Sequence, residues 1–253
     1  MDLFEYQGKE LFARHGIPVP SGEAAVTPAE ARAAAERIGG TVVIKAQVQV
    51  GGRGKAGGIQ LAANPDEAEA RATDILGMDI KGHIVGTVWV EAASEIAKEY
   101  YASITFDRGE KKPLVMLSAM GGIDIESVAE EHPEKLARLH VDPLTGFHPH
   151  HARRLCYEAD IDPEAMKGVI DILLKLYEGF VDLDAMLMEV NPLIVTTDGR
   201  VIALDAKVTI DGNALYRHPD ILALRDAGTA DPQERMAQEK GVTYVKLDGD
   251  IGI

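Results

Sequence analysis

The segment that most restricts the fold of this chain is residues 51–58, GGRGKAGG, in which five of the eight positions are glycine. Glycine is unfavourable inside helices and strands, so this run predicts a loop. Its glycines leave backbone N–H groups open to close approach, and Arg53 and Lys55 add the positive charge that a polyphosphate needs. The run lacks both the GK[ST] ending of a Walker A loop and the helix that follows a dinucleotide-binding glycine motif. A flexible surface linker is the alternative interpretation.

Lys45 lies in the mostly apolar stretch that precedes this loop. Thr41 to Val50 is rich in β-branched residues and predicts a strand, interrupted by Lys45 and Gln47. Burying an ammonium group is costly unless an anion meets it, so Lys45 is a candidate phosphate ligand. A lysine whose stem leaves a sheet edge for water is the alternative. The neighbouring glycine loop favours a phosphate-binding role.

Composition excludes several classes of partner. The 253 residues carry 26 basic and 41 acidic side chains, a net charge of −15, which repels nucleic acid and anionic membranes. An anionic substrate must therefore be met by a few clustered cations and backbone N–H groups. Cys156 is the one cysteine, so a disulfide within the chain is impossible and a cytoplasmic location is expected. No apolar run approaches the ~20 residues of a membrane-spanning helix.

Strand and helix patterns alternate without a strict βαβ rhythm, which predicts an α+β fold. Helices are expected before Gly16, over 28–38 and 65–76, and through much of 125–180, with strands over 41–50, 59–62, 87–92, 100–106, 113–118, 185–189 and 201–205. Beyond residue 212 the pattern becomes acidic and helical, and an apolar stretch follows at 242–247.

Carboxylates at the ends of predicted strands form two candidate sites. Glu91 ends the strand VWVEA and Glu99 follows it, where a carboxylate between two lobes could accept hydrogen bonds from a base or ribose. A solvated strand-end glutamate is the usual alternative. Glu189 and Asn191 in MEVNPL alternate onto one face of a strand, and Asp205 ends the next strand. Such hard oxygen ligands suit Mg²⁺, and Pro192 is expected to end the strand pairing.

The histidines and the cysteine do not indicate catalysis. His148, His150 and His151 lie together, but no cysteine or carboxylate stands nearby at a zinc-site spacing, so a loop is the preferred interpretation. The chain has neither a GxSxG elbow nor a Ser-His-Asp order, and Cys156 lies in a helical pattern without an activating motif. Nucleophilic catalysis by this chain is not expected.

Seven motifs in order along nearly the whole chain resemble the β subunits of succinate–CoA ligases. They are LFEYQGKELFARHGIPVP, VIKAQVQVGGRGKAGG, VEAASEIAKEYY, GGIDIESVAEE, MEVNPL, ALDAKVTIDGNALYRHPD and YVKLDGDIG. Together they are highly specific, although each alone is modest. The resemblance implies an ATP-grasp fold over residues 1–253, in which two α+β lobes clamp a nucleotide. Residues 20–100 would form the smaller, nucleotide-covering lobe, and 1–19 with 101–253 the larger lobe that carries the metal site.

The same resemblance assigns roles to single residues. It matches Lys45, Gly52, Arg53 and Gly54 to phosphate contacts, Glu91, Ser94 and Glu99 to contacts near the base and ribose, and Asn191 and Asp205 to magnesium ligands. Glu189 matches a glutamate that steadies a phosphohistidine, which swings in from the partner α subunit. The turn at Gly121 and Gly122 resembles a family loop beside that site. Pro20 looks like the ATP-type form at a position that separates ATP-using from GTP-using members.

The family reaction converts ATP, succinate and CoA to ADP, phosphate and succinyl-CoA through that phosphohistidine. The histidine belongs to the α subunit, so none of the eight histidines here is expected to take its role. The family's β subunit continues into a second α/β domain that contacts the α subunit and helps form the succinate site. We expect this chain to lack that domain, and to bind Mg-ATP without completing the reaction. The alternatives are a malate–CoA or other acyl-CoA ligase β subunit, and a non-catalytic nucleotide-binding scaffold.

Overall fold

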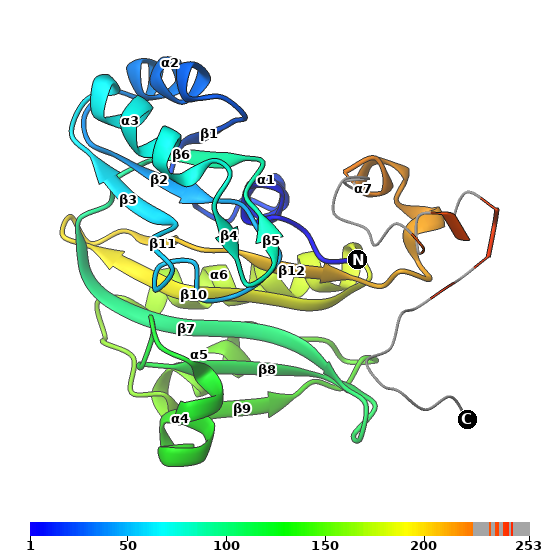
Figure 1. The fold of residues 1–253 in the computed structure, drawn as a ribbon. Helices are drawn as coiled ribbons and strands as arrows, with labels where there is room; N and C mark the ends of the chain where they lie inside the picture. The colour runs from blue at the N-terminus through cyan, green and yellow to red at the C-terminus, as the bar shows by residue number, and fades with distance from the viewer. Residues whose placement is uncertain (225–232, 234–235, 238–239, 243, 245–253) are drawn as a thin grey trace.

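A computed structural model describes residues 1–224, 233, 236–237, 240–242 and 244 of the chain (Figure 1). The apolar stretch expected over 242–247 lies largely outside the described residues. In the described part, no helix combines the length and the apolar character that crossing a bilayer would need.

The smaller sheet has four antiparallel strands in the order β1-β6-β2-β3. These are β1 (Gly22–Ala25), β2 (Val42–Ala46), β3 (Ile59–Ala62) and β6 (Val88–Ala92). Two helices, α2 (Pro28–Ile38) and α3 (Pro65–Ile75), lie over its outer face, above the sheet in Figure 1. Both helices bury alanines, and these small side chains let them pack closely in one apolar core. A short hairpin of β4 (Asp79–Ile80) and β5 (His83–Ile84) extends from this lobe.

The larger sheet has six strands in the order β11-β10-β7-β8-β9, with β12 also paired to β10. They are β7 (Ile96–Asp107), β8 (Lys112–Ser118), β9 (Leu136–His140), β10 (Ala185–Thr196), β11 (Val201–Ala203) and β12 (Lys207–Ile210). Helices α5 (Pro149–Glu158) and α6 (Met166–Asp182) cover its rear face in Figure 1 and share its apolar core with α1 (Glu5–Arg14). The remaining short helices are α4 (Ile125–Glu131), η1 (Pro133–Lys135), η2 (Leu215–Arg217) and α7 (Pro219–Leu222).

The sequence prediction missed β1, the short hairpin of β4 and β5, β9 and β12, and it misjudged the end of β10. Residues 136–140, LARLH, form a strand because they pair with β8, a contact that local sequence does not reveal. The prediction that Pro192 ends the pairing is wrong, because β10 resumes its ladder with β7 at Leu193. Val190 pairs with Ala102 and Leu193 with Tyr100, so two residues of β10 face one of β7. This bulge accommodates the proline, which cannot donate to the ladder.

Candidate active site

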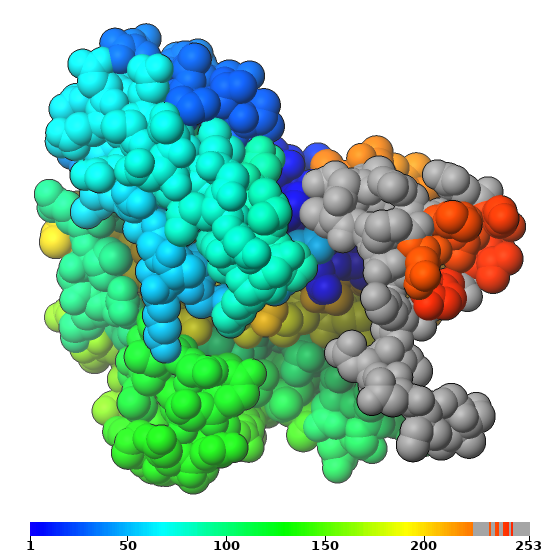
Figure 2. All heavy atoms as spheres, viewed as in Figure 1, coloured from blue at the N-terminus to red at the C-terminus, as the bar shows by residue number. Residues whose placement is uncertain are grey.

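A cavity of about 470 Å³ lies between the glycine loop of the smaller lobe and strands β10 and β12 of the larger one. In Figure 2 the segment before β3 reaches down from the smaller lobe toward the larger lobe. The residues lining the cavity include six of the predicted site residues, namely Gly52, Arg53, Gly54, Glu189, Asn191 and Asp205. The fold thus places the phosphate-binding candidates opposite the metal-ligand candidates.

A cluster of buried charges joins the two lobes behind this cavity. Lys45 Nζ lies 2.7 Å from Glu91 Oε1 and 2.9 Å from Glu5 Oε1. It also donates to the carbonyl oxygen of Leu204, in the larger lobe, at 3.0 Å. Lys9 of α1 pairs with the same two glutamates. Lys45 is therefore buried and matched by anions, which excludes the sheet-edge interpretation.

The opposite charges shift the pKa values of Glu5 and Lys45 toward their charged forms. Burial by itself would raise the pKa of Glu5, but Lys45, Lys9 and Arg53 hold it well below its usual range. Burial would lower the pKa of Lys45, yet Glu5 and Glu91 raise it above its ordinary value. For Lys9, burial prevails and its pKa is lowered. A buried charge survives only where such partners offset its lost hydration.

Arg53 reaches from the glycine loop to carboxylates on both sides of the cavity. Its guanidinium donates to Glu5 Oε2 at 2.5 Å and to the two Asp205 oxygens at 2.9 and 3.1 Å. Asp205 lies between β11 and β12, and its Oδ1 also accepts from the backbone N–H of Ala206 at 2.7 Å. A phosphate-binding candidate and a metal-ligand candidate are thus paired with each other.

Glu189 lies within β10, beside Ser103 of β7 and Lys207 of β12. The Tyr101 hydroxyl lies 3.2 Å from Glu189 Oε2, to which it donates, and 2.9 Å from Ser103 Oγ. Burial raises the pKa of Glu189, although the charge of Lys207 and the tyrosine hydrogen bond oppose this shift. The carboxylate is thus held in a fixed orientation at the wall of the cavity.

Asn191 connects the cavity to the turn at residues 121–123. Its Oδ1 accepts from the N–H of Gly122 at 2.8 Å, and its Nδ2 donates to the carbonyl of Ile123 at 2.9 Å. Gly122 has φ +73°, and a Cβ there would lie 2.3 Å from Glu99 Oε2. Glu99 is therefore near Asn191 through this turn. It does not line the cavity with the glycine loop, nor the second cavity described below.

The donor set around the cavity fits a magnesium ion. Asn191 and Asp205 contribute hard oxygen atoms, and Mg²⁺ usually takes only one or two protein carboxylates, with water and phosphate oxygens completing its shell. Within the described residues, no group of three or more His, Cys, Asp or Glu side chains could hold a metal on its own. His148, His150 and His151 therefore do not form such a group. They lie at the start of helix α5 rather than in the expected loop, and the ring of His148 stacks on those of His150 and His151.

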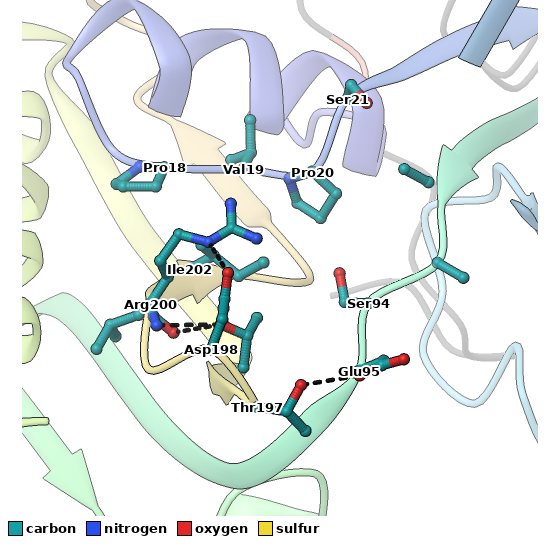
Figure 3. A pocket seen from close by; sticks show the side chains of 14 residues that line it. Pro18, Val19, Pro20, Ser21, Ser94, Glu95, Thr197, Asp198, Arg200 and Ile202 are labelled. Atoms are coloured by element: carbon teal, nitrogen blue, oxygen red, sulfur yellow. Dashed lines mark hydrogen bonds and ion pairs between the residues drawn. The ribbon is translucent and has the colours of Figure 1, made fainter. Parts of the chain in front are cut away.

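A second cavity, of about 610 Å³, opens where the two lobes are connected (Figure 3). Its wall includes Pro20 on the entry to the smaller lobe, Ser94 on the segment between β6 and β7, and Ile202 of β11. Figure 3 shows the Ser94 side chain and the Pro20 ring on this wall, with Thr197 donating to Glu95 at 2.9 Å. Ser94 thus lies apart from the cavity of Arg53 and Asp205.

Glu91 is placed differently from the expected base-binding carboxylate. Its side chain is 0% exposed. Its oxygens face Lys9 and Lys45, and Oε2 accepts from the Trp89 indole at 2.9 Å. The prediction of a carboxylate open to a nucleotide is therefore wrong. The sequence shows that Glu91 lies at the end of a strand, but it does not show that Lys9 and Lys45 of other elements pair with it.

Three side chains of the site were not predicted from the sequence, namely Glu5, Lys9 and Tyr101. Glu5 and Lys9 read only as polar positions in a helix that precedes the glycine loop by some forty residues. A charged pair at i and i+4 facing the buried side of α1 was the available signal. Tyr101 had no signal, because its role depends on a hydrogen bond to Glu189, which lies on another strand.

Comparison with known proteins agrees with this geometry. Residues 2–195 match the family model of the ATP-grasp domain. Over all 253 residues the chain is 53% identical to the ADP-forming succinate–CoA ligase subunit beta of Rubrobacter xylanophilus and 51% identical to the GDP-forming one of Thermus thermophilus. It spans 66% and 67% of those proteins, about two thirds of their length.

Solved structures show the same fold at lower identity. The dinucleotide-forming acetyl-coenzyme A synthetase 1 of Ca. Korarchaeum cryptofilum, in complex with coenzyme A and Mg-AMPPCP, matches with a TM-score of 0.62 and 19% identity. The match covers 83% of this chain and 92% of that one. With the two-lobed fold, the buried Lys45 and the facing glycine loop and metal-ligand candidates, these matches show that the chain belongs to the ATP-grasp family, among the β subunits of succinate–CoA ligases.

Proposed function

We propose that this chain binds Mg-ATP between its two lobes and serves a phosphoryl transfer. The observation that carries the proposal is the cavity that brings Gly52, Arg53 and Gly54 to Asn191 and Asp205. Lys45 and Arg53 would meet the phosphates, together with the N–H groups of the loop. A bound Mg²⁺ would neutralise phosphate charge during the transfer, and Asn191 and Asp205 are the residues that would hold it.

The base and ribose would occupy the second cavity, near Ser94 and Pro20. Glu99, which lines neither cavity, would approach the ribose from the side of the turn at Gly122. The cavity's apolar wall from Pro20 and Ile202 suits a planar base. For the boundaries of the nucleotide clamp we propose 20–100 as the covering lobe and 1–19 with 101–253 as the larger lobe. The four-stranded sheet supports this division, because its strands all fall between residues 22 and 92.

We further propose that the complete protein acts as a succinate–CoA ligase with an α subunit that carries the phosphorylated histidine. Glu189 would steady this phosphohistidine, since its fixed carboxylate reaches the cavity where the terminal phosphate would lie. In the solved Ca. Korarchaeum synthetase, which shares the fold, a phosphohistidine segment points towards the nucleotide-binding site. The names of both curated relatives support succinate as the acid.

The direct test is calorimetric titration of the 253-residue chain with ATP and with GTP, each with and without Mg²⁺. We expect magnesium-dependent binding that favours ATP. The Asp205→Ala variant should lose the magnesium dependence, and an Arg138→Ala variant on β9 serves as a surface control. Absence of binding to either nucleotide would refute the proposal for this chain. For the complete β subunit with its α partner, assay of several dicarboxylates identifies the acid.

A further inference from the structure

Glu5 is the side chain on which the cations of the site converge. It is the first residue of α1, and its side chain is only 2% exposed. Lys9, Lys45 and Arg53 lie 2.8, 2.9 and 2.5 Å from its two carboxylate oxygens. These cations come from three different elements, namely α1, β2 and the glycine loop. A single carboxylate thus sets the relative positions of the two cations proposed to meet phosphate.

The charges around Glu5 balance. Three cations (Lys9, Lys45 and Arg53) face three carboxylates (Glu5, Glu91 and Asp205) within one connected cluster. Asp205 and Glu5 both line the cavity, but Asp205 is 32% exposed, whereas Glu5 and Glu91 are 2% and 0% exposed. Asp205 is thus the carboxylate able to turn toward a metal ion.

This difference decides which contact of Arg53 can persist. If Asp205 turns to a metal, Arg53 loses two of its hydrogen bonds, and the bonds to Glu5 at 2.5 Å and to the carbonyl oxygen of Ala46 at 3.2 Å remain; of these two, only the bond to Glu5 is charge-assisted on both sides. Glu5 also accepts a hydrogen bond from Lys45, and although it lines the cavity, its side chain is only 2% exposed. An anchored guanidinium meets a phosphate at a smaller entropic cost than a free one.

We infer that Glu5 is a positioning residue that holds Lys45 and Arg53 in place for the phosphates of the nucleotide, an inference that rests on the proposed function. Glu5 does not touch the nucleotide itself. Its loss should therefore weaken binding of the triphosphate and spare binding of the nucleoside. If the Glu5 carboxylate instead competed with the phosphates for these cations, replacing Glu5 would tighten ATP binding.

The test compares Glu5→Gln with Glu10→Gln, which makes the same change at an exposed position of α1. Calorimetry measures the affinity for Mg-ATP and for adenosine. We expect Glu5→Gln to weaken Mg-ATP binding about tenfold or more, as the loss of charge-assisted hydrogen bonds implies, and to leave adenosine binding unchanged. Glu10→Gln should change neither affinity.

A charge-balanced double variant controls for misfolding of Glu5→Gln. Glu5→Gln alone leaves an extra buried cation, whereas Glu5→Gln with Lys9→Met removes one charge of each sign and leaves Lys45 and Arg53 facing Glu91 and Asp205. We expect this double variant to fold and to show the same split between Mg-ATP and adenosine. Unchanged Mg-ATP affinity, tighter Mg-ATP binding, or equal losses for both ligands would each overturn the inference.

Hydrogen–deuterium exchange separates this inference from the proposed function. In the nucleotide-free chain, exchange across residues 50–58 should be faster in the double variant than in wild type, and unchanged in Glu10→Gln. If wild type bound no ATP, the proposed function would fail, while the exchange result would still decide whether Glu5 positions the loop. Equal exchange in all three proteins would show that it does not.

Discussion

The pairing of Arg53 with Asp205 predicts that the nucleotide-free chain binds divalent cations poorly and that removing the arginine improves this binding. The two hydrogen bonds of 2.9 and 3.1 Å occupy both oxygens of a proposed metal ligand. A cation arriving without nucleotide must displace a guanidinium that is itself only 11% exposed. Arg53→Gln takes this competitor away and leaves the carboxylate in place.

The size of the effect follows from the geometry. A pair of unit charges about 4 Å apart is worth roughly 4 kcal/mol at an effective dielectric constant of about 20. This is an upper figure, because Asp205 is about one third exposed and solvent screens the pair. A net value of about 1.5 to 2 kcal/mol, at the low end for charge-assisted hydrogen bonds, is appropriate. It corresponds to an increase in affinity of about 10- to 30-fold.

The assay is electron paramagnetic resonance of Mn²⁺ titrated into the nucleotide-free chain. Wild type should bind the ion weakly and Arg53→Gln more tightly by this factor. Lys55→Gln is the matched control, because it removes a positive charge from the same loop at a residue for which no contact with Asp205 is seen. Equal Mn²⁺ affinity in wild type and Arg53→Gln, or an equal gain in Lys55→Gln, would refute the competition between arginine and metal.

Three further predictions concern other parts of the chain. Burial raises the pKa of Cys156 to about 11, so Ellman's reagent should label the thiol at pH 8 only as fast as the chain unfolds, and rapid labelling of the folded chain would contradict this. The same shift means that the free energy of unfolding falls as the pH rises above the pKa of the thiol in the unfolded chain. Gly122→Ala places a Cβ 2.3 Å from Glu99 Oε2 at a positive φ, so thermal denaturation should show a loss of about 1 to 2 kcal/mol, whereas Gly212→Ala, with open space around it, should cost less. Tyr101→Phe removes the hydrogen bond to Glu189 and should lower stability by about 1 kcal/mol in chemical denaturation while leaving Mg-ATP affinity unchanged; a large loss of affinity would show that this tyrosine serves the nucleotide instead.

Much of the candidate site was open to prediction because its chemistry is local. The glycine loop with Arg53 could be recognised from eight consecutive residues, and Glu189 with Asn191 from the alternation of one strand. The fold class could be predicted for the same reason, since helix caps such as Thr27 and apolar periodicity act over a few residues. The role of each site residue toward a nucleotide stays a prediction until the titrations above are made.

The sequence by itself determined which groups are available to bind a polyphosphate and a metal, because side-chain chemistry and strand alternation are properties of neighbouring residues. Only the tertiary structure decided how these groups are paired. It brought Glu5 to Lys45 and Arg53, turned the Glu91 carboxylate inward, and set Arg53 against Asp205 across 152 positions of the chain. It also decided that β10 continues beyond Pro192 after a bulge and that residues 136–140 pair with β8 in the sheet. The physical reason is that a buried charge or an unpaired strand is stabilised by whichever partner the fold places beside it, and that partner is distant in sequence.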